Sequence, residues 1–163
     1  MTSMTPMTTA LTLNETVLKN ARPEVAVWLA EFVVRNGGFV GSVHLTEPAE
    51  REGEIVLVAA HNLPPSVQNG TATIPFGKGM AGTAAERREP VAISDFQADT
   101  TGVAVPGGRA AQSRGSLTLP VHTPDEDAKP VAVVGLGFTE SRDFTEDELA
   151  AYGEDAATVL TVA

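Results

Sequence analysis

Four side chains that can hydrogen-bond a small molecule occupy alternate positions in two apolar segments. Ser42 and His44 alternate with apolar residues in FVGSVHL, and Ser116 and Thr118 do so in SLTLPV. Alternate residues of a β-strand face opposite sides of the sheet. If the apolar sides of both strands lie beneath helices, the four polar residues share the other side and form a wall suited to a ligand. The alternative is that they are exposed or hydrogen-bonded within the protein.

Residues 94–114 contain glycine, serine, aspartate and proline without a regular period, and they carry two arginines. A loop of this length in a compact domain commonly covers a binding site, so we expect a lid. Arg109 and Arg114 could each hold a carboxylate or phosphate through two parallel N–H groups, unless both are simply solvated. Phe96 is a further candidate contact, although it could instead close the cavity. We expect a small polar or anionic metabolite between this lid and the polar wall.

Other site chemistries lack the residues that they require. The chain has no cysteine, which excludes disulfides, thiolate nucleophiles and Cys-ligated zinc. Its three histidines, His44, His61 and His122, show no metal-binding spacing, so we expect no metal site and no cofactor. No triad or pair of carboxylates stands in a recognisable motif. The sequence therefore predicts a protein that is not an enzyme.

Length and charge narrow the possible partners. With 163 residues the chain is expected to form one domain over residues 13–163, after a disordered leader at residues 1–12. Twenty-one acidic against eleven basic residues give a net charge of −10, which disfavours nucleic acids and anionic membrane surfaces. The most apolar window, residues 25–34, is half the length of a membrane span, and the N-terminus does not resemble a secretory signal. We expect a cytoplasmic location.

The elements that must position the polar wall can be predicted along the chain. A helix is expected from Asn14 with a break at Pro23, and it continues to Gly37. Two hairpins, a third strand at 71–76 and a fourth at 91–93 supply a sheet, with a short helix between residue 79 and Pro90. Thr145 and Glu148 form a capping box for the last helix, whose apolar stripe is Leu149, Tyr152, Ala156, Val159 and Leu160. This order predicts the α+β class, an antiparallel sheet with the terminal helices on one face and the lid loop on the other.

Four segments of the chain resemble a GAF domain in residue identity and spacing. They are IPFGKGMAGTAAERREPVAISD at 74–95, SLTLPV at 116–121, VVGLGF at 133–138 and DFTEDELAAYGEDAATVL at 143–160. The resemblance covers roughly residues 15–162. It implies an antiparallel sheet of about six strands, a small-molecule pocket between sheet and lid, and a homodimer formed through the terminal helices.

Enzymatic and cyclic-nucleotide branches of that family are similar to this chain but differ at informative positions. Free methionine-R-sulfoxide reductases work through cysteines, and Ala81 stands in the corresponding slot of the glycine-rich stretch. Cyclic-nucleotide-binding members have an Asn-Lys pair where this chain has Gly137 and Phe138. The resemblance therefore implies a non-catalytic sensor that binds a small molecule and regulates a separate protein partner. The alternatives are a dimeric scaffold without a ligand and an inactive relative of the sulfoxide reductases.

Overall fold

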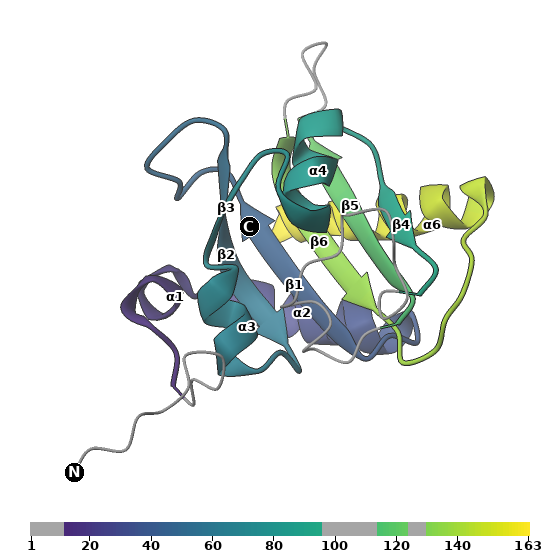
Figure 1. Ribbon diagram of the computed structural model, residues 1–163, viewed down its shortest axis with the longest axis horizontal. Coiled ribbons are helices and arrows are strands. Elements are labelled where there is room, and N and C mark those ends of the chain that lie inside the picture. The colour runs from purple at the N-terminus through teal and green to yellow at the C-terminus, as the bar shows by residue number, and fades with distance from the viewer. Residues whose placement is uncertain (1–11, 96–113, 124–129) are drawn as a thin grey trace.

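A six-stranded antiparallel sheet forms the centre of the protein. The computed structural model describes residues 12–95, 114–123 and 130–163, and the strand order across the sheet is β3-β2-β1-β6-β5-β4. The hairpins β1–β2 and β5–β6 place β1 and β6 side by side in the middle of the sheet (Figure 1). The strands are β1 (Val40–Leu45), β2 (Glu54–His61), β3 (Thr73–Pro75), β4 (Val91–Ile93), β5 (Ser116–His122) and β6 (Pro130–Gly137).

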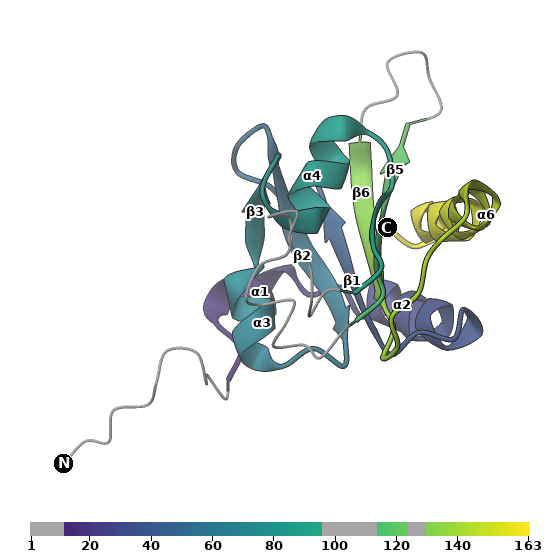
Figure 2. The same cartoon turned by 45° about the vertical axis from the view of Figure 1, so that its right-hand side comes forward.

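Helices cover both faces of this sheet. Figure 2 shows α2 and α6 on one face and α3 and α4 on the other, with α1 beside α3. Asn69 links α1 and α3, because its side chain accepts from the backbone of Asn14 at 2.8 Å and donates to the carbonyl of Thr12 at 2.9 Å. The helices are α1 (Glu15–Asn20), α2 (Pro23–Arg35), α3 (Pro65–Gly70), α4 (Gly79–Arg87), α6 (Glu146–Ala156) and the 3₁₀-helix η3 (Ala157–Thr161).

Local sequence signals begin the terminal helices at the expected places. The side chain of Asn14 caps α1 by accepting from Val17, and Pro23 occupies the first turn of α2, where its missing N–H is not needed. The capping box of α6 is present, with Thr145 and Glu148 each accepting from the other's backbone N–H. These predictions are confirmed. No helix in the described ranges is both long and apolar enough to cross a bilayer.

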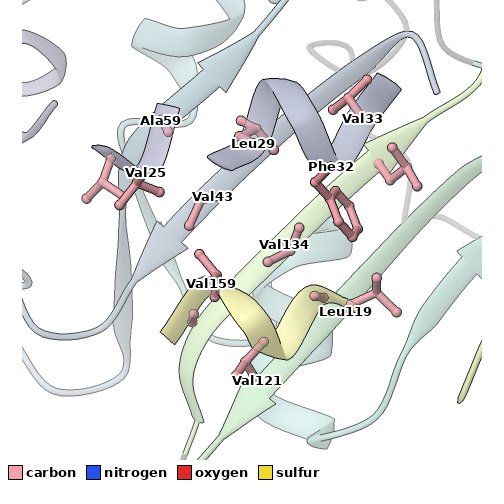
Figure 3. Close-up of a cluster of buried hydrophobic side chains, with 14 of the residues drawn as sticks. Val25, Leu29, Phe32, Val33, Val43, Ala59, Leu119, Val121, Val134 and Val159 are labelled. Carbon is pink, nitrogen blue, oxygen red and sulfur yellow. The ribbon is translucent and has the colours of Figure 1, made fainter. Parts of the chain in front are cut away.

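The main hydrophobic core lies between the sheet and the helices α2, α6 and η3. Figure 3 shows the side chains of α2 and of the C-terminal segment meeting those of the central strands. Every second residue of β1, β6 and β5 enters this core, as a half-buried sheet requires. The core includes Val25, Leu29, Phe32, Val43, Leu119, Val134 and Val159.

Polar contacts fix the C-terminal segment against α2. Arg35 donates to both carboxylate oxygens of Asp155, at 2.7 and 3.0 Å, and Trp28 Nε1 donates to the hydroxyl of Thr158 at 2.9 Å. The guanidinium hydrogen bonds lower the pKa of Asp155. Helix α2 and the C-terminal segment therefore form one helical layer.

A second, smaller core lies on the opposite face, beneath α4. Ala84 and Ala85 of α4 pack there against Ile55, Val91 and Val133 from three strands. The small residues of α4 allow the helix to approach the sheet closely. Gly82 is the tightest point, because a Cβ there would overlap the carbonyl oxygen of Pro75.

The predicted fold class is confirmed, with differences in detail. The sequence did not indicate α3, and the strand expected at 71–76 is only Thr73–Pro75. Leu160 was expected in the buried stripe but is 43% exposed, because the last turn tightens into η3 and rotates it outward. Residues 96–113 of the lid expected at 94–114, and residues 1–11 of the leader expected at 1–12, lie outside the described residues.

Replacing Gly82 with alanine is expected to lower the free energy of unfolding by about 1–3 kcal/mol, because the added methyl group forces α4 away from β3. Gly153→Ala in α6 is the matched control, since a Cβ there meets nothing within 4 Å. That variant should gain roughly 0.5–1 kcal/mol from better helix propensity. Urea denaturation measures the free energy of unfolding of both variants. Equal changes in that free energy would contradict the close approach of α4 to β3 at Gly82.

Candidate ligand-binding cavity

A cavity of about 160 Å³ lies on the sheet face that carries α3 and α4. Residues from β1, β5 and β6 line it on the sheet side, and the start of α4 and part of α3 line it on the other. Most of the lining is apolar, which is typical of small-molecule sites. The apolar lining residues include Val40, Leu63, Val67, Ile74 and Met80.

All four residues of the polar wall lie in this lining. Ser42 and His44 of β1 and Ser116 and Thr118 of β5 face away from the α2 and α6 layer, because the apolar residues between them enter the main core. His44, Ser116 and Thr118 are buried, and Ser42 is half-buried. The four side chains thus share one face, as the alternation in the sequence predicts, and their role in ligand binding stays a prediction.

Two glycines of β6 make the space between the two halves of the wall. Gly135 pairs with Ser42 on one side and with Thr118 on the other, and Gly137 pairs with Ser116. A Cβ on Gly135 would lie 2.6 Å from the hydroxyl oxygen of Ser42. At these two positions β6 contributes only backbone to the lining. The space that side chains would fill is left open as part of the cavity.

His44 is held in one protonation state by its surroundings. Its Nε2 lies 2.8 Å from the carbonyl oxygen of Thr71, the residue that ends α3. Burial of the ring lowers the pKa of His44 from 6.5 to about 4, so the imidazole is neutral at pH 7. A carbonyl oxygen can only accept, so Nε2 carries the single proton and Nδ1 is a bare acceptor. This Nδ1 is buried and has no hydrogen-bond partner.

The first turn of α4 lines the cavity opposite the strands. Gly79, Met80 and Ala81 are lining residues, together with the exposed Lys78 that precedes them. Gly79 has a φ of 65°, a left-handed conformation that favours glycine where the chain turns into the helix. No aspartate or glutamate appears among the described lining residues.

The remaining predicted site residues do not join this lining within the described part of the chain. Arg114 is paired instead with Asp95 at 2.6 Å, and its backbone N–H donates to the carbonyl of Phe138. Arg109 and Phe96 lie outside the described residues. This pair joins the described residues on either side of residues 96–113.

Sequence reasoning missed the contributions of Thr71, Lys78, Gly135 and Gly137 to this site. Thr71 contributes a backbone carbonyl, which no side-chain pattern reveals. The two glycines left a usable signal, because their spacing in VVGLGF places both on one side of the strand. Groups of three potential metal ligands are absent from residues 12–95, 114–123 and 130–163.

A sequence profile of the GAF domain matches residues 24–160. No curated protein matches the chain in sequence. Among solved structures, the chain is similar to the GAF domain of a phosphoenolpyruvate-protein phosphotransferase from Coxiella burnetii. The identity is 24%, the match covers 90% of this chain and 89% of that one, and the TM-score is 0.59.

Two further structures show the range of proteins that share this fold. The free methionine-R-sulfoxide reductase of Neisseria meningitidis, in complex with its substrate, is 19% identical over 94% of both chains, with a TM-score of 0.58. The second GAF domain of DevS from Mycobacterium smegmatis is 20% identical over 85% of this chain and 88% of that chain, with a TM-score of 0.59. At these identities the likeness concerns the fold alone.

The buried, neutral state of His44 predicts a dependence of stability on pH. Its folded-state pKa of about 4 lies below the ordinary 6.5, so between these values the unfolded chain binds a proton that the folded protein does not. The His44 contribution is therefore complete above pH 6.5 and is lost as the pH falls toward 4. Between pH 7 and pH 4.5 the loss should amount to about 2 kcal/mol.

Urea denaturation at both pH values checks this contribution. The variant His44→Gln keeps an amide N–H for Thr71 but cannot titrate, so its stability should fall less than that of the wild type between pH 7 and 4.5. His61→Gln, at the end of β2 and outside the cavity lining, controls for the loss of a histidine elsewhere. Parallel losses in the wild type and His44→Gln would show that His44 is not protected from protonation.

Proposed function

The chain belongs to the GAF domain family, and from that premise we propose that it is a non-catalytic sensor. It binds a small molecule in the cavity between β1, β5, β6 and α4, and it regulates a separate protein. GAF domains are commonly sensory, and they commonly bind small molecules and form dimers. The observation that carries the proposal is the cavity itself, with four hydrogen-bonding side chains around a floor of two glycines.

The absence of catalysis in this proposal rests on the chemistry of the lining. The chain has no cysteine, and Ala81 lines the cavity at the start of α4. A thiol-based reduction of a sulfoxide therefore has no nucleophile here. The described lining also offers no carboxylate that could act beside His44 as a general acid or base. A scaffold without a ligand is the competing function, and ligand binding decides between the two.

We propose that a second copy of the chain covers the outer surface of α2 and the C-terminal segment. Val27 and Val34 of α2 are 62% and 73% exposed, and Leu160 and Val162 at the C-terminal end are exposed as well. Such an apolar surface on a soluble domain is typical of an interface, and two-fold pairing is the commonest way to cover it. Trp28 and Arg35 of α2 donate hydrogen bonds to Thr158 and Asp155. A movement of α2 would therefore also move the C-terminal segment and change the proposed interface.

Filling the cavity is expected to abolish ligand binding. In Ala81→Leu the longer side chain occupies space beside Met80, whereas Ala151→Leu adds the same atoms to an exposed position of α6. A set of single-ring fragments should shift the amide NMR signals of Thr118 and Gly135 in the wild type and in Ala151→Leu, and should leave Ala81→Leu unchanged. A wild-type protein that binds no fragment, or an Ala81→Leu variant that binds as well as the wild type, would favour the scaffold.

A charge on the outer face of α2 is expected to separate the dimer. Val34→Glu places a carboxylate in the proposed interface, while Leu18→Glu changes a similarly exposed apolar residue of α1 outside it. Sedimentation equilibrium should report a dimer for the wild type and for Leu18→Glu, and a dissociation constant for Val34→Glu that is at least about tenfold larger. A monomeric wild type, or a dimer indifferent to Val34→Glu, would rule out this interface.

A further inference from the structure

We propose that the protein has a second small-molecule site, a cavity between α1, the start of α2 and β2, and that this edge cavity takes a monocarboxylate with an apolar body. Its volume is about 300 Å³, compared with about 160 Å³ for the cavity of the proposed sensor function. The two cavities share no described lining residue, so the second site does not depend on the sensor function.

The edge cavity lies where β2 loses its neighbouring strand. β3 pairs with β2 only over residues 54–56. Beyond them the connection between α1 and α2 takes the place of a strand, and the backbone N–H of Arg22 donates to the carbonyl of Val58 at 2.9 Å. The next residues of β2 are Ala59 and Ala60, whose small side chains leave the space beside this connection unfilled.

Most of the described lining of the edge cavity is apolar. Val17 of α1 and Val58 and Ala59 of β2 are buried, and Pro23 and Ala26 of α2 lie in the same lining. Protein interiors are close-packed, so ordinary packing does not leave a space of this size. An engineered apolar cavity of roughly 150 Å³ holds benzene, so the edge cavity can hold a body of about two rings.

Arg22 supplies the charge that selects a carboxylate. It is the only charged side chain among the described lining residues. Within the described part of the chain its guanidinium donates no hydrogen bond, and its ion-pair partner Glu47 lies 3.7 Å away with a side chain that is 81% exposed. A guanidinium offers parallel N–H groups that match the two oxygens of a carboxylate. A ligand carboxylate can therefore form the hydrogen bonds that Glu47 does not.

The surrounding charges favour a ligand with a single negative charge. One carboxylate neutralises Arg22, whereas a second would be repelled by Glu47 and by the net charge of −10. The Arg22 side chain is 32% exposed, so a carboxylate bound to it keeps part of its hydration. The apolar body gains free energy by leaving water for the apolar lining.

Three probes test the proposal on the unmodified protein at pH 7. 2-Naphthoate carries both the charge and a two-ring body, 2-naphthalenemethanol has the same body without the charge, and acetate has the charge without the body. Amide NMR titrations that follow Ala21 and Ala26, which line only the edge cavity, report binding there. 2-Naphthoate should bind at least about tenfold more tightly than 2-naphthalenemethanol. Acetate should bind more weakly than either.

The variant Arg22→Met assigns the preference for a carboxylate to one side chain. Methionine keeps the backbone N–H that bonds to Val58 and an apolar stem of similar length, but it removes the charge. The naphthoate and the alcohol should then bind with similar affinities. Arg51→Met is the matched control, since Arg51 is exposed in the β1–β2 connection and lies outside the lining, and it should keep the wild-type preference.

Glu47→Gln tests the same contact in the opposite direction. It removes the carboxylate that competes for Arg22, so 2-naphthoate should bind at least about twofold more tightly than to the wild type. Glu52→Gln removes an exposed charge of the same connection that has no ion pair with Arg22, and it should change the affinity less.

Filling variants separate the two cavities. Ala26→Leu should abolish the 2-naphthoate shifts at Ala21, whereas Ala81→Leu, in the lining of the other cavity, should preserve them. If Ala26→Leu does not fold, the three probes on the wild type still decide the question.

Several results would overturn the second site. They are equal binding of 2-naphthoate and 2-naphthalenemethanol to the wild type, shifts confined to Thr118 and Gly135 of the other cavity, and failure of all three probes. An affinity for 2-naphthoate that Arg22→Met leaves unchanged would also overturn it. None of these results bears on the sensor function, which fragment binding at Thr118 and Gly135 tests separately.

Discussion

The alternation of residues along β1, β6 and β5 is the constraint on which both the core and the cavity depend. One side of these strands supplies the apolar side chains that α2 and α6 cover, and the other side supplies hydroxyls, an imidazole and two glycines. A slip of one residue in any pairing would bury Ser42 or Thr118 beneath the helices and move a core residue into the cavity. The packing of the main core therefore fixes the chemistry of the opposite face, and the site cannot shift without loss of stability.

Polar groups on a buried face need hydrogen-bond partners, and the surrounding structure supplies only some of them for His44. His44 is satisfied at Nε2 by the end of α3, which ties the position of that short helix to the central strand. Its Nδ1 remains without a partner, and its burial keeps the ring neutral. Ordinary cores avoid such a group or satisfy it fully. Among the described residues, Nδ1 of His44 and Nε2 of His122 are the exceptions to this rule.

Much of this arrangement follows from local rules that can be applied to the sequence. Alternation located the four wall residues, and Asn14, Pro23 and the capping box at Thr145 located the helix starts. Helix α3 was missed because PSVQNG is short and has no apolar period. The pairing of Arg114 with Asp95 joins residues 19 positions apart, and the role of Thr71 depends on a carbonyl that every residue has. Such contacts arise from tertiary structure, which no local pattern encodes.

The protonation state of His44 at rest tests the account most directly, because the cavity chemistry depends on it before any ligand is added. Long-range ¹⁵N–¹H correlation spectra of protein labelled in histidine nitrogen distinguish a bare ring nitrogen from a protonated one. We expect His44 to show a protonated Nε2 and a bare Nδ1 at pH 7, with no change down to about pH 5, since its pKa is about 4. A His44 whose two nitrogens exchange the proton, or that becomes charged near pH 6.5, would contradict the account.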